Sequence, residues 1–205
     1  MKKFIKYLLY SIIIFGFIVL LLSFQSAHFL DYLIILSRSL ILLLFLIVFS
    51  LVFVYIKQVR KNSEKLDDFK YFFAKFIVFF ILFNISFFSI GGILNFKVRN
   101  EIKAFLKKTG PGICNIKVDG CCIETSDKFF DALRDIHGSL IKPVSRNKAK
   151  YEIICRDSSI TLLIAKDPRP EQKNMYWVYC PKYRVTKNNN VGVFKYQGKI
   201  KCKQQ

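Results

Sequence analysis

Three long apolar segments occupy the first half of the chain. They run from about Phe4 to Phe24, from Leu33 to Ile56 and from Phe72 to Leu94. Each exceeds the roughly 18 to 20 apolar residues that an α-helix needs to cross about 30 Å of hydrocarbon. The stretch from Leu40 to Ile56 has no polar stripe of the kind that a helix packed on a soluble core shows. The pattern predicts a transmembrane region at 1–96, with helices at about 4–24, 33–56 and 72–94.

Lys and Arg near these segments predict their orientation, because cytoplasmic loops of membrane proteins are rich in both. Basic residues precede the first segment and recur through 57–70, whereas 25–32 contains none. We therefore expect a multi-pass inner-membrane protein with a cytoplasmic N-terminus and an extracytoplasmic, periplasmic C-terminal domain. The first segment is interpreted as a retained anchor, because its apolar stretch is longer than that of a signal peptide. Cleavage would leave the C-terminal domain on the same side.

Two polar side chains within the expected spans need partners. Arg38 follows Asp31 by seven residues, and we expect it to reach the outer headgroups, alone or paired with Asp31. Asn84 lies near the middle of the third segment, and we expect it to hydrogen bond with another helix. The spans contain no carboxylate, which disfavours a conduction path.

From residue 97 the pattern changes to the short segments of a water-soluble domain. Asp119-Gly120 is the signal of a type I′ turn, and it joins two strands within 113–124. Helical spacing of apolar residues predicts a helix over about 127–137, and 99–108 is expected to form a separate short helix.

A second hairpin follows, with Asp157-Ser158 as its expected turn, and two further strands lie near 175–179 and 191–196. The element order is then ββαββββ, which is an antiparallel sheet with one packed helix. The predicted fold class is therefore a membrane α-helical region at 1–96, followed by a small α+β domain at 97–205.

The composition adds a strong positive charge. The chain has 33 Lys and Arg against 14 Asp and Glu, for a net charge of +19, and 53% hydrophobic residues exclude intrinsic disorder. One explanation is a basic proteome encoded in AT-rich DNA. The other is attraction to anionic headgroups of a lipid bilayer or to an acidic protein partner. Nucleic acid is not an expected partner of an external domain.

All six cysteines lie in the second half of the chain. An even number fits disulfides in an oxidising compartment, whereas buried free thiols are the alternative. Six cysteines allow 15 pairings, and the sequence does not select one. The absence of a CxxC pair argues against a zinc site. The candidate disulfide residues are Cys114, Cys121, Cys122, Cys155, Cys180 and Cys202.

No catalytic or nucleotide-binding motif is present, so we expect neither an enzyme nor a cofactor. An aromatic group, Tyr176, Trp177, Tyr179 and Tyr183, is a candidate partner surface, although a core strand is the commoner explanation. The leading hypothesis is a basic external domain that binds a protein or envelope component without chemistry, for example as an immunity-type protein. The alternative is a membrane signalling or assembly subunit that relays an external binding event to a cytoplasmic partner at 57–70.

Overall fold

The computed structural model describes residues 17, 21–22, 24–59, 66–108, 114–123, 127–139 and 147–198. The chain divides into two compact units, Met1–Ile93 and Leu94–Gln205. The sequence pattern places the boundary slightly later, at 96/97.

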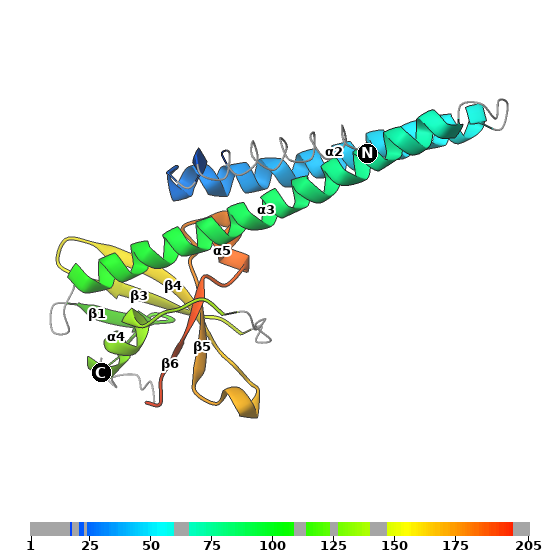
Figure 1. The fold of residues 1–205 in the computed structure, drawn as a ribbon. Helices are drawn as coiled ribbons and strands as arrows, with labels where there is room; N and C mark the ends of the chain where they lie inside the picture. Colours follow the sequence, from blue (N-terminus) through cyan, green and yellow to red (C-terminus); the bar gives the residue numbers. More distant parts are fainter. Residues whose placement is uncertain are drawn as a thin grey trace. The chain divides into compact units, whose positions relative to one another are not determined.

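Two long helices make up most of the described part of the first unit (Figure 1). Helix α2 spans Ala27–Val59, and α3 spans Leu66–Lys108, so α3 continues past Ile93 into the second unit. The hydroxyl of Ser26 accepts a hydrogen bond from the amide of Phe29, which satisfies one of the unpaired donors at the start of α2. Many large apolar side chains of this unit are exposed, among them Phe49, Phe53 and Phe88.

The expected membrane spans do not appear in the structure. None of the helices in its described portion combines the length and the apolar character that crossing a bilayer requires. Most of the expected span at 4–24 lies outside the described residues. In α2 and α3, the longest stretches of described side chains are 27–39 and 88–108, and both contain charged residues, which are costly in hydrocarbon.

The prediction of a three-helix membrane region is therefore wrong for the part of the chain that the structure describes. The multi-pass inner-membrane location, and the periplasmic placement of the C-terminal domain that depended on it, are corrected with it. The separate helix expected at 99–108 is also absent, because α3 runs without a break to Lys108.

The second unit contains an antiparallel sheet whose described strands follow the order β2-β1-β3-β4-β5-β6 (Figure 1). The strands are β1 Asn115–Val118, β2 Cys121–Ile123, β3 Ala149–Ile154, β4 Ser159–Lys166, β5 Met175–Tyr179 and β6 Gly192–Lys195. Helix α4, Asp127–Arg134, follows β2. A short 3-10 helix, Pro170–Gln172, precedes β5, and α5, Arg184–Asn188, joins β5 to β6.

The first hairpin has the expected turn. Asp119 and Gly120 both have positive φ angles, 49° and 87°, as a type I′ turn requires. Val118 pairs with Cys121 directly before and after it. This prediction is confirmed.

The second hairpin turns one residue earlier than expected. Ile154 pairs with Ser159, and the amide of Cys155 donates to the carbonyl of Ser158, so Arg156 and Asp157 form the turn and each pair is shifted by two residues from the expected register. A shift of two keeps every side chain on its predicted face. Cys155 follows the last paired residue of β3 and stands opposite Cys114, with which it forms a disulfide, with their Cα atoms 4.2 Å apart.

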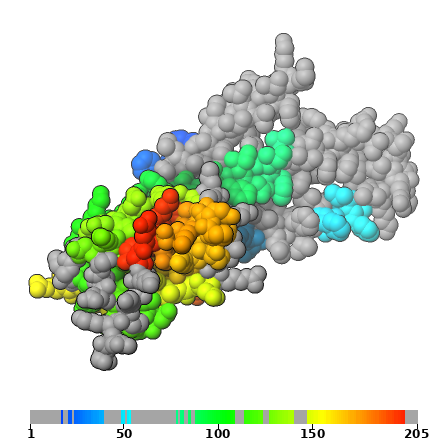
Figure 2. All heavy atoms as spheres, turned by 90° about the horizontal axis from the view of Figure 1, so that it is seen from below, coloured from blue at the N-terminus to red at the C-terminus, as the bar shows by residue number. Residues whose placement is uncertain are grey.

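Helix α4 covers one face of the sheet. The ring of Phe129 stacks on Tyr151 and meets Phe194 edge-on, with centroids 5.8 and 5.9 Å apart. The helix ends at Arg134, earlier than predicted, because His137 leaves it to pair with Val193 beside β6. In the space-filling view, the red segment that ends the described chain lies against the orange segment before it, as the pairing of β5 with β6 requires (Figure 2).

The part of α3 that belongs to the second unit is fixed to it by buried apolar contacts and hydrogen bonds. Val98, Ile102 and Leu106, spaced four residues apart, are fully buried. Arg99 donates to the carbonyl of Val191, and Arg134 donates to the carbonyl of Leu106.

A second apolar cluster lies on the opposite face of β4, β5 and β6. Because both faces are covered, every residue of β5 is buried. The cluster consists of Ala165, Met175, Trp177, Tyr179 and Val193.

Loss of the Cys114–Cys155 disulfide should destabilise the oxidised protein. The bond joins residues separated by 41 positions, and closing a loop of that length is worth about 3 to 4 kcal/mol in the chain-entropy model. We expect the Cys114→Ser/Cys155→Ser double variant to lose about this much unfolding free energy in urea titrations. Cys122→Ser, which removes an exposed free thiol, is the control and should change stability by less than about 0.5 kcal/mol. Equal stability of both variants would contradict the assignment.

Candidate functional site

Two adjoining hollows lie where β4 ends and β3 begins, with volumes of about 580 and 460 Å³. Asn147 and Lys166 line both, so together they form one depression, which we call the strand-end groove. The larger part, the tyrosine hollow, has a floor of Ala149, Tyr151, Ile164 and Tyr176, and a rim of Asp119, Asn147, Lys148 and Lys166. The smaller part, the loop hollow, is lined by Asn147, Lys166 and residues of the loop after β4, namely Asp167, Pro168, Arg169, Pro170 and Lys173.

The sheet register places the floor of the tyrosine hollow. Ala149 pairs with Ile164, and Lys166 pairs with Tyr176, so these side chains emerge on the same face of neighbouring strands. Tyr151 is only 4% exposed and Tyr176 only 9%. Both line the hollow, yet neither hydroxyl has a hydrogen-bond partner among the described residues.

Both phenols remain protonated at neutral pH. The pKa of Tyr151 is raised to about 12, chiefly by burial and then by nearby Tyr176, Asp119 and Tyr196. The pKa of Tyr176 is also raised, chiefly by burial and then by Tyr196. The hollow therefore contains two hydroxyls that can donate hydrogen bonds.

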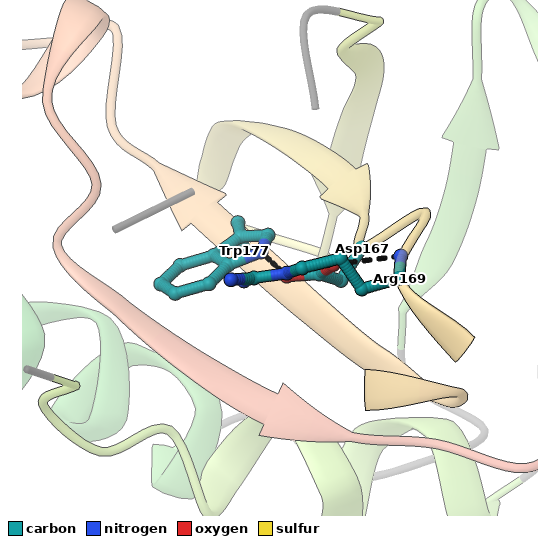
Figure 3. A network of polar contacts seen from close by, with 3 residues as sticks. All are labelled: Asp167, Arg169 and Trp177. Atoms are coloured by element: carbon teal, nitrogen blue, oxygen red, sulfur yellow. Dashed lines mark hydrogen bonds and ion pairs between the residues drawn. The ribbon is translucent and has the colours of Figure 1, made fainter. Parts of the chain in front are cut away.

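A buried carboxylate fixes the loop hollow. Asp167 accepts hydrogen bonds from Nε of Arg169 at 2.9 Å, from its Nη2 at 2.5 Å, and from Nε1 of Trp177 at 2.7 Å. Figure 3 shows the guanidinium and the indole N–H both directed at the carboxylate. The hydrogen bond from Arg169 is the largest cause that lowers the pKa of Asp167, against the opposing effect of burial. Asp167 is therefore a structural anion and not a proton donor.

The cations of the groove differ in what they face. Nζ of Lys148 lies 3.8 Å from the ring centroid of Tyr179 and donates to the carbonyl of Lys187. Lys166 and Lys173 are exposed and make no ion pair with any residue in the described ranges. They consequently supply the positive charge that an incoming ligand would meet.

This arrangement is suited to binding an anion with hydrogen-bond acceptors. The described lining has no histidine or cysteine, and its buried carboxylate is already paired. Within the described ranges, no group of three or more His, Cys, Asp or Glu residues is placed to hold a metal ion.

The structure places the predicted aromatic surface in the interior. Tyr176, Trp177, Tyr179 and Tyr183 are all buried. Tyr176 opens onto the tyrosine hollow, Trp177 donates to Asp167, and Tyr179 lies beneath Lys148. The hydroxyl of Tyr183 donates to Glu101 of α3 at 2.5 Å.

The described cysteines are in three chemical states. Cys114 is bonded to Cys155, and Cys121 is also disulfide-bonded. Cys122 is an exposed free thiol, whereas Cys180 is a buried one whose pKa is raised by burial. Cys202 lies outside the described residues.

The two polar residues of the expected spans lie on different helices. Arg38 is exposed on α2. The amide nitrogen of Asn84 donates to the carbonyl of Phe80, one turn earlier in α3, at 2.8 Å.

Sequence reasoning did not identify the groove. In the sequence, Tyr151 lies in an apolar alternation typical of a core strand, and Asp167 begins a polar segment typical of a loop. One signal was available, since a loop rich in proline and charge directly after an apolar strand is a common place for binding residues. The shared face of Lys166 and Tyr176 required the register.

No protein-family model matches this chain, and neither the curated proteins nor the solved structures contain a match.

Replacing Asp167 should lower stability in a pH-dependent way. Asp167→Asn removes the charge that Arg169 and Trp177 bind, and we expect a loss of about 2 kcal/mol of unfolding free energy at pH 7. The pKa of Asp167 is lower in the folded protein than in the unfolded chain, where an Asp side chain titrates near pH ~4. The charge of Asp167 therefore stabilises the fold fully above that pH, and this stabilisation is lost as the pH falls toward the folded-state pKa. The gap between the wild type and the variant should thus narrow in acid.

Urea titrations between neutral and acidic pH measure this difference. Asp157→Asn, in the exposed turn of the second hairpin, is the control and should differ little from the wild type at any pH. A gap between wild type and Asp167→Asn that stays constant down to the acid limit would argue against a stabilising carboxylate.

Proposed function

We propose that the C-terminal unit is a non-catalytic binding module that takes an acidic segment of a partner protein in the strand-end groove. One observation carries this proposal. Lys166 and Lys173 are exposed without ion pairs among the described residues, beside hollows whose buried acid, Asp167, is already neutralised. The groove therefore offers positive charge that no contact within the described ranges uses.

The distribution of charge in this unit supports an acidic partner. Several carboxylates are engaged by neighbouring cations, namely Asp131 by Arg134, Glu152 by Lys150 and Glu101 by Lys182. The chain as a whole carries a net charge of +19. A field of this sign accelerates encounter with acidic proteins and repels basic ones.

Features of the groove favour a peptide over a nucleic acid. The floor of the tyrosine hollow combines the apolar side chains of Ala149 and Ile164 with phenol rings, which suits a side chain better than a row of phosphates. Asp119 on the rim would repel a continuous phosphate backbone. Each hollow is also large enough for one or two side chains.

Binding without chemistry is supported by the state of the lining groups. Asp167 is held ionised by Arg169, and the phenols of Tyr151 and Tyr176 have raised pKa values. A general base at neutral pH needs a pKa near 7, and none of these groups has one.

Charge reversal in the groove should abolish binding of an acidic peptide. A short fluorescein-labelled oligoglutamate peptide, titrated against the full-length protein and followed by anisotropy, measures the affinity. We expect Lys166→Glu/Lys173→Glu to weaken binding by more than tenfold, because two attractive charges become repulsive. Lys128→Glu/Lys195→Glu is the matched control, because both lysines are exposed and neither lines the groove. This control variant has the same net charge as the groove variant.

The outcomes separate a site from diffuse attraction. A loss confined to the groove variant supports the proposal. Equal losses in the groove and control variants would mean that the peptide follows net charge alone. No binding by the wild type at low ionic strength, where exposed charges are least screened, would overturn the function.

A further inference from the structure

We infer that the tyrosine hollow is a carboxylate-binding subsite, in which the hydroxyls of Tyr151 and Tyr176 and the ammonium of Lys166 receive one carboxylate of the bound acidic segment. This inference rests on the proposed function and makes it specific. It assigns the hydrogen-bond donors of the site and the functional group that they recognise.

Hydrogen-bond donors that the described part of the protein does not use are the main argument. Tyr151 and Tyr176 are 4% and 9% exposed, both line the hollow, and neither hydroxyl has a hydrogen-bond partner among the described residues. Neither hydroxyl oxygen is a fully buried atom, so both open onto the solvent in the hollow. A carboxylate bound there can accept hydrogen bonds from both hydroxyls in place of water.

Aromatic packing holds the two rings in place before a ligand arrives. The ring of Tyr151 stacks on Phe129 with centroids 5.8 Å apart, and the ring of Tyr176 stacks on Phe194 at 5.4 Å. Phe129 and Phe194 contact each other edge-to-face, so the four rings form one connected group. Donors fixed in this way lose little conformational entropy on binding.

The charges around the hollow select an anion and orient it. Lys166 is the sheet partner of Tyr176, so its ammonium and the phenol project from adjacent strands on one face. Lys148 is turned toward Tyr179 and Lys187. Asp119 lies on the rim and accepts a hydrogen bond from the amide of Lys150. A carboxylate is therefore expected at the Lys166 end, with donor groups of the peptide toward Asp119.

Space for the ligand depends on a small side chain. Ala149, at the start of β3, pairs with Ile164 and forms part of the floor. A longer side chain at this position would project into the tyrosine hollow from the same face. Filling the hollow is consequently a second way to block the site that leaves all charges unchanged.

Tyrosine-to-phenylalanine variants test the inference with the labelled oligoglutamate peptide and the full-length protein. Each of Tyr151→Phe and Tyr176→Phe removes one hydroxyl and keeps the ring, and we expect each to weaken binding by about tenfold, the effect of one hydrogen bond to a charged group. Ala149→Leu should weaken binding at least as much. Tyr179→Phe is the matched control, because Tyr179 belongs to the cluster on the opposite face of the sheet and should leave affinity unchanged.

Stability measurements distinguish a binding role from a structural one. Because neither hydroxyl is paired within the described protein, the two phenylalanine variants should keep or slightly raise the urea midpoint. A marked fall in midpoint would show that the hydroxyls serve the fold and would overturn the inference.

The remaining outcomes separate the two proposals. If Lys166→Glu/Lys173→Glu abolishes peptide binding while both phenylalanine variants bind like the wild type, the carboxylate subsite is wrong and the proposed function stands. If the wild type does not bind the peptide, the proposed function fails. Glutarate, a free dicarboxylate, and inorganic phosphate can each be tested as competitors of the labelled peptide. If phosphate displaces the peptide at a far lower concentration than glutarate does, the subsite recognises a phosphate and the carboxylate assignment is wrong.

Discussion

The carboxylate of Asp167 receives hydrogen bonds from the side chain and amide of Arg169 and from the indole of Trp177. Trp177 belongs to the apolar cluster between β4, β5 and β6, so this contact fixes the loop after β4 to the interior of the C-terminal unit. The geometry of the strand-end groove depends on it, because Lys166 and Lys173 stand at the two ends of that loop. The ion pair with Arg169 also neutralises Asp167, the buried acid of the described loop-hollow lining. Lys166 and Lys173 therefore determine the charge of this part of the groove.

Structural and binding groups are separated in this unit. Asp131 and Glu152 pair with cations of their own elements. Glu101 pairs with Lys182, and Arg99 and Arg134 donate to backbone carbonyls distant in sequence, so these three residues hold separate segments together. The hydroxyls of Tyr151 and Tyr176 have no such role among the described residues. Side chains that are already ordered and that the fold does not use lose little conformational entropy when a ligand binds to them.

The local predictions succeeded where one short-range rule decides the outcome. Asp119-Gly120 specified a type I′ turn, because few other residues adopt two successive positive φ angles. In the second hairpin, the alternation predicted the correct faces, but the register shifted by two residues, because the chain turns at Arg156 and Asp157, one residue earlier than expected. Helix α4 ended early because His137 pairs with Val193, a residue distant in sequence. The apolar segments predicted membrane spans that the described residues do not support.

The amino-acid sequence by itself determined the alternation that makes the strands, the first turn, the order of the sheet elements and the excess of positive charge. These are properties of neighbouring residues or of composition. Only the tertiary structure decided which groups meet at the groove. Tyr151, Lys166 and Tyr176 come from three different strands, and Asp167 finds Trp177 ten residues away on the next strand. Such contacts depend on strand register and on closure of the sheet, which residues far apart in the chain establish together.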